Sequence, residues 1–199
     1  MKTTNFKFKI LLLCSFVLAG ILFSGCAPMT RTSKYMAAAV GSPTSPPTGK
    51  TLVCIHRPTT SIGWKLYTKI WCDSKFIADL GNGHSIAYVC EPGVHYFINT
   101  SVEETGCVEA HLLPDQTYDL KVQGGYGVWI ASFKLKLLHQ DEKTRQLVAK
   151  WTRKNRWVEA TSPTADIQAK EDHVKEIQEE FISGKRHDKL QQLAPDDHR

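Results

Sequence analysis

The sequence predicts an all-β fold, an antiparallel β-sandwich of about 7–8 strands, with a flexible N-terminal tether and a C-terminal amphipathic helix. Short apolar runs with period two recur at intervals of about ten residues over 51–138, and turn residues separate them. No helical period is found over 51–135. Gly81-Asn82-Gly83 is the strongest hairpin signal in the chain.

The expected strands are apolar runs that end at turns such as Asp73-Ser74, Glu91-Pro92-Gly93 and Pro114-Asp115. Apolar and polar side chains alternate most clearly in the last run, so one side of that strand is expected to face the core. The runs cover residues 52–55, 66–72, 76–80, 86–90, 94–100, 108–113, 118–122 and 129–138.

Residues 1–25 have the pattern of an export signal. Three lysines and no acidic residue stand in this segment, and an apolar run over 10–23 follows them. The run is about 14 residues long, whereas a helix that spans a bilayer needs roughly 20. We therefore predict a signal peptide over 1–25 and an exported protein.

Cys26 directly follows Ser24-Gly25, and this junction resembles the lipobox of bacterial lipoproteins, although Phe23 stands where leucine is usual. The resemblance implies that Cys26 is acylated and that fatty chains such as palmitate hold the protein to the membrane. Ala27 replaces the aspartate that favours inner-membrane retention in that family, so the implied location is the outer membrane, facing the periplasm. The alternatives are an uncleaved anchor or an ordinary signal peptide with an unrelated Cys26.

The charge of the exported part argues against nucleic acid as a partner. The whole chain of 199 residues has a formal charge of +5, with 25 Lys and Arg against 20 Asp and Glu. Three of the cations lie in 1–25, so the remainder has 22 cations and 20 acids, a net charge of +2. This small excess is typical of a soluble domain in the periplasm.

Residues 26–50 are rich in Ser, Thr, Pro, Ala and Gly and contain few large apolar side chains. Such a segment buries too little surface to order itself, so we predict a lipid-anchored flexible linker. The β-sandwich domain is expected over 51–158 and a C-terminal helix and tail over 159–199.

Four cysteines remain in the exported part once Cys14 and Cys26 are set aside. An even number in a compartment that permits disulfides makes one or two bridges possible, and small buried hydrophobes are the alternative. The sequence does not choose between these alternatives or among the three possible connectivities. The possible disulfide cysteines are Cys54, Cys72, Cys90 and Cys107.

Two segments after Leu138 are less regular. Residues 139–158 fit a hairpin with a closing strand or a short helix, and the hairpin is slightly favoured. Ser162-Pro163 then provides a helix start, and apolar side chains recur at helical spacing up to a stop at Gly184, after which the tail is expected to fray. The expected apolar stripe consists of Ile167, Val174, Ile177 and Phe181.

The turns between 51 and about 138 carry four short motifs, Ile55-His56-Arg57-Pro58, Cys72-Asp73-Ser74-Lys75, Leu80-Gly81-Asn82-Gly83 and Pro92-Gly93-Val94-His95. These motifs resemble those of an uncharacterised bacterial lipoprotein family, whose central region is a domain of unknown function. The shared pattern is approximately Tyr-Arg-Pro, Asp-Gly-Lys, Leu-x-Asn-Gly and Pro-Gly-x-His, with two departures at His56 and Ser74. The resemblance covers under half of the chain and implies a small β-sandwich. The family has no established catalytic residues, so the resemblance implies no activity.

The sequence contains no catalytic motif, and we predict no catalytic residue, no metal site and no cofactor. His56, His84, His95 and His111 stand in the β region without a tight ligand spacing. His95 belongs to the Pro-Gly-x-His turn, where a side chain that packs on or bonds to the loop is expected. No Gly-x-Ser-x-Gly elbow is present, and Gly124-Gly125-Tyr126-Gly127 is interpreted as a loop rather than a phosphate site.

One basic and aromatic segment is a candidate for contact with the envelope. Cations beside tryptophans suit anionic headgroups or polymers, and the alternative is an exposed last strand whose tryptophans cover a core edge. The possible contact residues are Trp151, Arg153, Lys154, Arg156 and Trp157, and Arg57, Trp64 and Tyr67 are a weaker second candidate.

The sequence thus favours a lipid-anchored cell-envelope lipoprotein that acts as a non-catalytic binding or structural module. Its expected partners are the membrane, through acyl chains on Cys26, and an unidentified envelope protein or glycan. One alternative is an envelope enzyme with a site assembled from distant histidines and acids. Another is a protein that contacts the membrane surface or peptidoglycan through residues 150–157.

Overall fold

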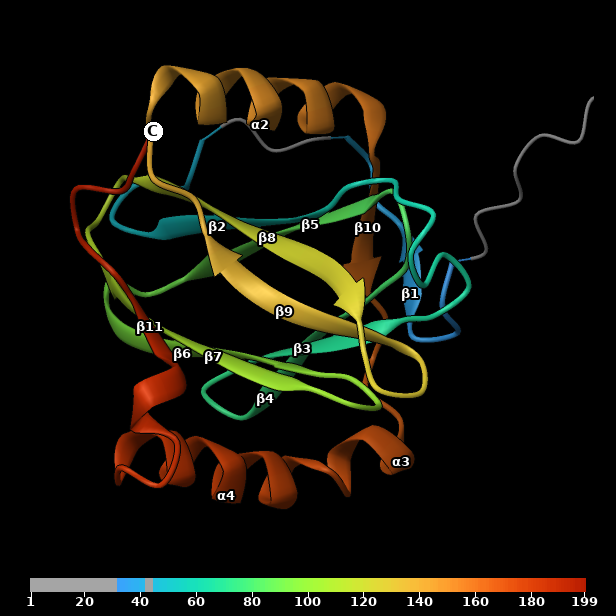
Figure 1. The fold of residues 1–199 in the computed structure, drawn as a ribbon. Helices are drawn as coiled ribbons and strands as arrows, with labels where there is room; N and C mark the ends of the chain where they lie inside the picture. The colour runs from blue at the N-terminus through green and yellow to red at the C-terminus, as the bar shows by residue number, and fades with distance from the viewer. Residues whose placement is uncertain (1–31, 42–44) are drawn as a thin grey trace, which may run out of the picture. The chain divides into compact units, whose positions relative to one another are not determined.

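The protein is described by a computed structural model over residues 32–41 and 45–199 (Figure 1). These residues contain eleven strands, and all eight predicted runs form strands, β2 to β9. The strands are β1 (Met36–Ala38), β2 (Thr51–Arg57), β3 (Thr68–Cys72), β4 (Lys75–Leu80), β5 (His84–Cys90), β6 (Gly93–Thr100), β7 (Thr105–Leu112), β8 (Thr117–Tyr126), β9 (Ala131–Leu137), β10 (Arg156–Ala160) and β11 (Leu190–Leu193).

The strands form two sheets, one with the order β1-β10-β5-β2-β8-β9 and the other with the order β11-β7-β6-β3-β4. The mostly β fold is confirmed, but the sheets are mixed rather than purely antiparallel. β2 pairs with β8 in parallel, as do β10 with β5 and β11 with β7. Parallel neighbours need long connections, and here the chain visits the other sheet or forms helices between them.

Two predicted turns connect the sheets instead of closing hairpins. Gly81-Asn82-Gly83 joins β4 to β5, and Glu91-Pro92 joins β5 to β6, yet β5 lies in the six-stranded sheet and β4 and β6 in the other. The hairpin expected at Gly81-Asn82-Gly83 is therefore wrong. Turn residues specify a reversal of the chain, whereas pairing partners are chosen by the faces that strands can bury.

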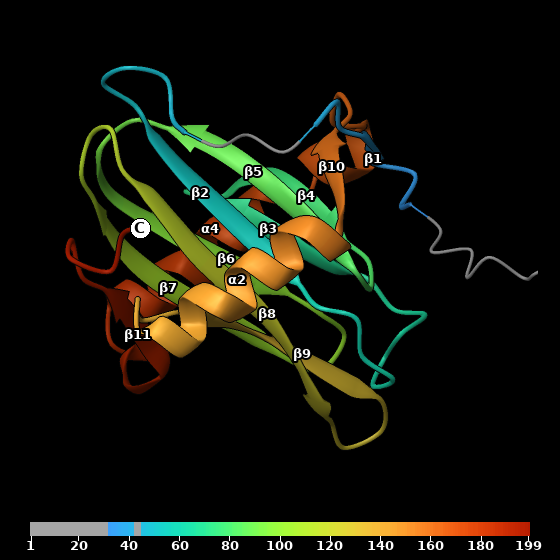
Figure 2. The ribbon, with the colours of Figure 1, turned by 90° about the horizontal axis from the view of Figure 1, so that it is seen from above.

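The main core lies between the two sheets. It contains Val53 and Ile55 of β2 and Phe97 of β6, all of them fully buried. All seven residues of β2 are buried. One face of β2 lies against the core, and α2 (Glu142–Lys154) covers the other face because it runs across the outer side of this sheet (Figure 2).

Helix α2 corrects the hairpin favoured for 139–158. The Asp141 side chain accepts a hydrogen bond from the Thr144 N–H and caps the helix at its N-terminus. Val148 and Trp151 then lie on one face, one turn apart, and both are buried. A spacing of three positions fits a helical period, whereas in a hairpin the two side chains would point to opposite faces and one would be exposed.

The C-terminal helix is confirmed as two pieces, α3 (Ala165–Gln168) and α4 (Glu171–Ile182). The four predicted stripe residues are all buried and pack against the outer face of the five-stranded sheet, beside Trp71, Ile98 and Cys107. α4 covers this sheet on the side away from α2 (Figure 1). The tail does not fray: it forms the 3-10 turn His187–Lys189 and then β11, where Leu193 is fully buried.

The linker expected over 26–50 is corrected for its described middle part. Residues Met36–Ala38 form β1, which pairs antiparallel with β10, and Tyr35 and Met36 are buried. Tyr35 packs against Phe76 of β4. Tyr35 and Met36 therefore bury apolar surface, although the composition of residues 26–50 as a whole does not indicate this. The leader and Cys26 lie outside the described residues.

The edge strand β9 is joined to the other sheet by side chains rather than by a strand. Asn99 of β6 is fully buried; its amide N–H donates to the Phe133 carbonyl at 2.7 Å and its oxygen accepts from the Leu135 N–H at 2.8 Å. Gln191 of β11 donates to the Leu135 carbonyl at 2.8 Å. These bonds satisfy backbone groups that an edge strand would otherwise leave unpaired.

Candidate functional site

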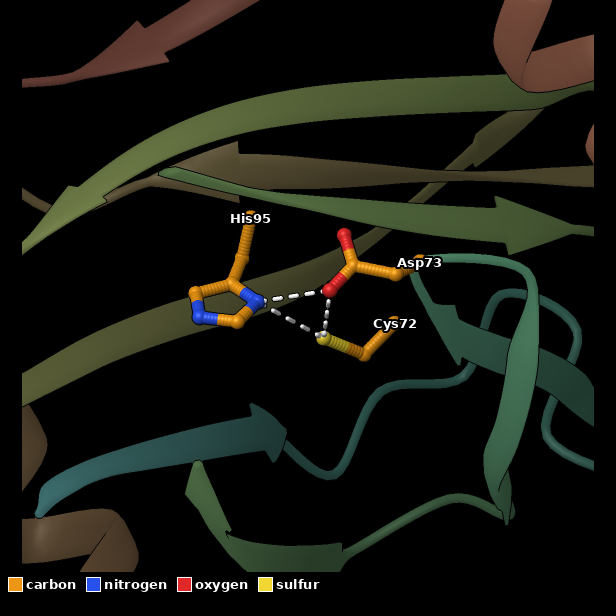
Figure 3. A group of neighbouring side chains, drawn as sticks. All are labelled: Cys72, Asp73 and His95. Atoms are coloured by element: carbon orange, nitrogen blue, oxygen red, sulfur yellow. Dashed lines mark hydrogen bonds and ion pairs between the residues drawn. The ribbon is translucent and has the colours of Figure 1, made fainter. Parts of the chain in front are cut away.

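The turn residue Asp73 and the strand residue His95 meet at one end of the five-stranded sheet (Figure 3). His95 Nδ1 lies 2.6 Å from Asp73 Oδ2, and His95 Nε2 donates to the Glu91 carbonyl at 2.8 Å. The expectation that His95 bonds to its own loop is therefore confirmed. The sequence did not predict its contact with Asp73, because the two residues stand in different turns.

Asp73 is held by the geometry of its own turn. Asp73 and Ser74 connect β3 to β4 with φ of 48° and 66°, so both central residues adopt the left-handed conformation of a type I′ hairpin turn. Asp tolerates this conformation, whereas Ser74 stands where glycine is usual and adopts it with strain. The Tyr96 N–H donates to Asp73 Oδ1 at 2.9 Å, which leaves Oδ2 free to face His95.

Cys72 completes this group. Its Sγ lies 3.8 Å from Asp73 Oδ2 and 3.9 Å from His95 Nδ1, so three potential ligand atoms come within 4.8 Å of one another. The group opens on a cavity of about 360 Å³, whose wall also contains Tyr88 and Cys90. The remaining wall residues are Lys50, Lys75, Val89 and Glu91, and Lys50 forms an ion pair with Glu91.

Charge and burial set the protonation of this group. The hydrogen bond to Asp73 raises the pKa of His95 despite partial burial, which favours the imidazolium. Burial alone would raise the pKa of Asp73, but hydrogen bonds from His95 and the Tyr96 amide outweigh it and lower this pKa. Burial raises the pKa of the Cys72 thiol, and the nearby Asp73 carboxylate raises it further, so Cys72 is a protonated thiol rather than a nucleophile.

A second polar group lies beneath α2 and was not predicted from the sequence. His56 Nδ1 lies 2.9 Å from Ser85 Oγ and His56 Nε2 lies 3.0 Å from Asp119 Oδ1, with all three side chains fully buried. Asn155 donates to Ser85 Oγ at 2.9 Å, and Arg199 Nε lies 3.2 Å from the other oxygen of Asp119.

Hydrolase triads also place a histidine between a serine and an aspartate. In those triads Nε2 faces the serine and Nδ1 faces the aspartate, whereas here Nδ1 faces Ser85 and Nε2 faces Asp119. Because Ser85 has no exposed surface, a substrate carbonyl cannot reach its hydroxyl in this arrangement. The network satisfies polar groups that the sheet and α2 bury together. Two of the other candidate histidines meet different acids, since His95 contacts Asp73 and His111 contacts Glu109.

The basic and aromatic segment does not present its tryptophans to a partner. Trp151 and Trp157 are 8% and 9% exposed, and their rings pack on the His56 ring at centroid distances of 5.9 and 5.7 Å. Arg153, Lys154 and Arg156 remain exposed on α2 and the start of β10. Of the two interpretations, contact of the rings with the envelope is therefore corrected, and the alternative, that the tryptophans cover the core, is the one found.

The weaker candidate patch is corrected as well. Arg57 is 1% exposed, and its guanidinium donates to the carbonyls of Gly63, Leu66 and Leu80 at 2.7–2.9 Å. Burial lowers its pKa to about 10. Trp64 alone of the three remains largely exposed, at 60%.

The four candidate disulfide cysteines are free thiols, and each of them is buried. Of the two alternatives, the disulfide bridges are therefore corrected, and the cysteines are small buried side chains. Burial raises the pKa of Cys54, Cys90 and Cys107 to about 12. These thiols face different parts of the fold: Cys54 lies under Trp157, Cys107 faces α4 and Cys90 lies in the main core.

A surface of exposed apolar side chains lies at the loops next to β9, and we call it the aromatic loop surface. Its members are Trp64, Val102, Tyr126, Val128 and Trp129, which are 60–90% exposed. The hairpin between β8 and β9 carries three of them, and its tip projects from the sheets in both views (Figures 1 and 2). Exposed apolar groups gathered in this way indicate an interaction surface.

Polar contacts hold these loops together. Glu103 Oε1 accepts hydrogen bonds from the N–H groups of Trp129 and Ile130 at 2.7 and 2.9 Å, which ties two loops to each other. A Cβ on Gly127 would lie 2.2 Å from the Ile130 carbonyl oxygen, so only glycine fits this turn. A cavity of about 800 Å³ adjoins the tip. The glycines expected to form a loop at 124–125 lie instead in the end of β8.

No protein-family model and no curated protein matches this chain. The likeness of its turns to the uncharacterised lipoprotein family thus remains a resemblance. Among the described residues, no helix is both long enough and apolar enough to cross a membrane.

Proposed function

We propose that this protein is a lipid-anchored, non-catalytic binding module of the bacterial cell envelope and that it holds a partner protein at the aromatic loop surface. The exposure of Tyr126, Val128 and Trp129, each 86–90%, carries the proposal. Water contact with such side chains is unfavourable by about 25 cal/mol per Å² of apolar surface, and a partner removes it. Tyrosine and tryptophan are also the side chains that most often dominate the energy of protein interfaces.

The chemistry around the tip favours a protein partner over a lipid or a glycan. An anionic bilayer attracts aromatic groups flanked by an excess of cations, whereas Glu103 and Glu104 balance Lys134 and Lys136 in the wall next to the tip, and Lys134 is paired with Glu104. A glycan needs hydrogen-bond partners around each ring, whereas the exposed Val128 separates Tyr126 from Trp129 along the hairpin. Mixed aromatic and aliphatic groups with a polar rim, which here includes Lys134, are the composition of a protein interface core.

The anchor in this proposal rests on the sequence pattern of residues 1–26. Two or more acyl chains on Cys26 would give stable attachment, since one chain alone binds a membrane only weakly. Ala27 supports an outer-membrane location that faces the periplasm. The domain would then present its loops to other envelope proteins.

A photo-crosslinking amino acid at position 128 tests the binding role in intact envelopes. We expect a discrete adduct that a protease destroys and lysozyme leaves intact. The adduct should weaken at least tenfold when Trp129→Ser is added. The matched control carries the crosslinker at position 182, an exposed isoleucine on α4, and should give no such adduct. Equal adducts at both positions, or a lysozyme-sensitive adduct, would contradict a protein partner at this surface.

The anchor is tested separately by labelling cells with a palmitate analogue. The parent chain should incorporate the label and fractionate with membranes, and Cys26→Ser should do neither. Label in Cys26→Ser equal to that in the parent would remove the anchor from the proposal and leave the binding surface untouched.

A further inference from the structure

We propose that Cys72, Asp73 and His95 form a binding site for a zinc-class divalent transition metal, with three protein ligands and a fourth position open to the adjoining cavity. The ligand atoms are Cys72 Sγ, one Asp73 carboxylate oxygen and His95 Nδ1. This site is independent of the aromatic loop surface. It lies between the turn that connects β3 to β4 and the turn that connects β5 to β6.

The spacing of the three atoms is close to that of a tetrahedral site. Zinc binds sulfur at about 2.3 Å and nitrogen or oxygen at about 2.0–2.2 Å, so tetrahedral ligands lie about 3.4–3.6 Å apart. The two separations that involve the Cys72 sulfur are 3.8 and 3.9 Å. The separation of His95 Nδ1 and Asp73 Oδ2 is 2.6 Å and must widen by about 0.8 Å, which a rotation of either side chain provides.

The surroundings of Asp73 and His95 are those of metal ligands. His95 Nε2 faces a carbonyl, which only accepts, so this nitrogen carries a hydrogen and Nδ1 is the ligating atom. Metal-binding histidines commonly direct their other N–H at a backbone carbonyl in this way. The second oxygen of Asp73 is likewise held by the Tyr96 N–H, so both ligands are oriented before a metal arrives.

The ligand set selects the class of metal. A thiolate with an imidazole and one carboxylate suits zinc and its neighbours, whereas calcium and magnesium prefer oxygen ligands alone. On binding, the Cys72 thiol and His95 Nδ1 each lose a proton to solvent, and the metal takes their place. Lys50 and Lys75 line the same cavity; Lys50 is paired with Glu91, which limits its repulsion of the metal.

The cavity gives the fourth position access to solvent. It measures about 360 Å³, enough for water or a small anionic ligand on the metal. Three protein ligands with one open position are typical of zinc sites that bind a further molecule, whereas structural sites use four. Cys90 lines the same cavity but stands outside the group of three, so it serves as a matched control.

The test is a titration of the purified full chain, in detergent and free of metal, with cobalt chloride and then zinc chloride. We expect one equivalent of cobalt to give a sulfur-to-cobalt charge-transfer band and tetrahedral d–d bands, which zinc then displaces. Magnesium and calcium should not compete. Asp73→Asn, Cys72→Ser and His95→Gln should each weaken zinc binding at least tenfold, while Cys90→Ser and His111→Gln should bind as the parent does.

Asp73→Asn keeps the test decisive even if another variant fails to fold. Asparagine adopts the left-handed turn conformation and accepts from the Tyr96 N–H, so circular dichroism of the metal-free variant should match that of the parent. A charge-transfer band of equal intensity in Cys72→Ser would overturn the proposal. Unchanged zinc affinity in folded Asp73→Asn, or loss of binding in Cys90→Ser, would overturn the three-ligand set.

Discussion

Replacing Asn99 by alanine tests the inference that side chains join β9 to the second sheet. The substitution removes both hydrogen bonds of the Asn99 amide and leaves the Phe133 carbonyl and the Leu135 N–H without these partners. Each buried polar group left unsatisfied costs about 1–3 kcal/mol, so the free energy of unfolding should fall by about 2–6 kcal/mol. A domain of this size has roughly 5–15 kcal/mol in all.

Asn82 is a matched control for this experiment. Its side chain also makes one hydrogen bond as donor and one as acceptor with a single backbone segment, at Thr60, with lengths of 3.0 and 2.9 Å. Asn82 lies in a half-buried turn, where water replaces the lost bonds, so Asn82→Ala should cost less than about 1 kcal/mol.

Urea unfolding of both variants gives the comparison, with calorimetry as a second probe. At about 2–4 °C per kcal/mol, Asn99→Ala should lower the Tm by roughly 5–20 °C. Hydrogen exchange at the Leu135 amide should accelerate in Asn99→Ala and stay unchanged in Asn82→Ala. Equal destabilisation by the two substitutions would refute the role assigned to Asn99.

Three further predictions concern protonation, packing and the thiols. Burial and the nearby cations lower the pKa of His84 from 6.5 to about 4. Between these two pH values the unfolded chain therefore binds more protons than the folded chain. The unfolding free energy should fall by up to about 3 kcal/mol as the pH drops from 6.5 to 4. Urea unfolding at several pH values in this range should give an unfolding free energy that depends less steeply on pH in His84→Gln than in the parent. An equal dependence on pH in the two chains would contradict the assignment. Phe181→Ala should cost about 3–5 kcal/mol in the same assay because Phe181 is fully buried, whereas exposed Ile182→Ala should cost under about 0.5 kcal/mol, and similar costs would argue against docking of α4. Alkylation followed by mass spectrometry should label the four buried cysteines slowly in native protein and fully after unfolding, and a disulfide-linked peptide would contradict their free state.

The local sequence pattern predicted the eight central strands, because the apolar alternation of a strand and the turn residues that end it are both recognisable from a few neighbouring residues. The same rules failed at Gly81-Asn82-Gly83, where the turn is real but its flanking strands belong to different sheets. They also failed at 142–154, where Val148 and Trp151 are the only fully covered apolar groups of a polar helix. Two buried apolar residues one helical turn apart are too few for their spacing to distinguish a helix from a strand.

The candidate sites were harder to predict because their members are distant in sequence. Cys72 and Asp73 were visible as a strand end and a turn, and His95 as a turn histidine, but nothing in their spacing joins them. Ser85, His56 and Asp119 meet only because β5 and β8 flank β2 in its sheet. Knowledge of that strand order would have placed all three on the face beneath α2.

By itself the sequence determined the β-rich class, the strand positions and the apolar stripe of the C-terminal helix, since each of these is written in neighbouring residues. Only the tertiary structure decided which strands pair, that the tryptophans of 151–157 face inward, that the cysteines stay free, and which loops carry the exposed rings. Those outcomes depend on which surfaces meet across the fold, and burial is a property of the assembled chain rather than of any short segment.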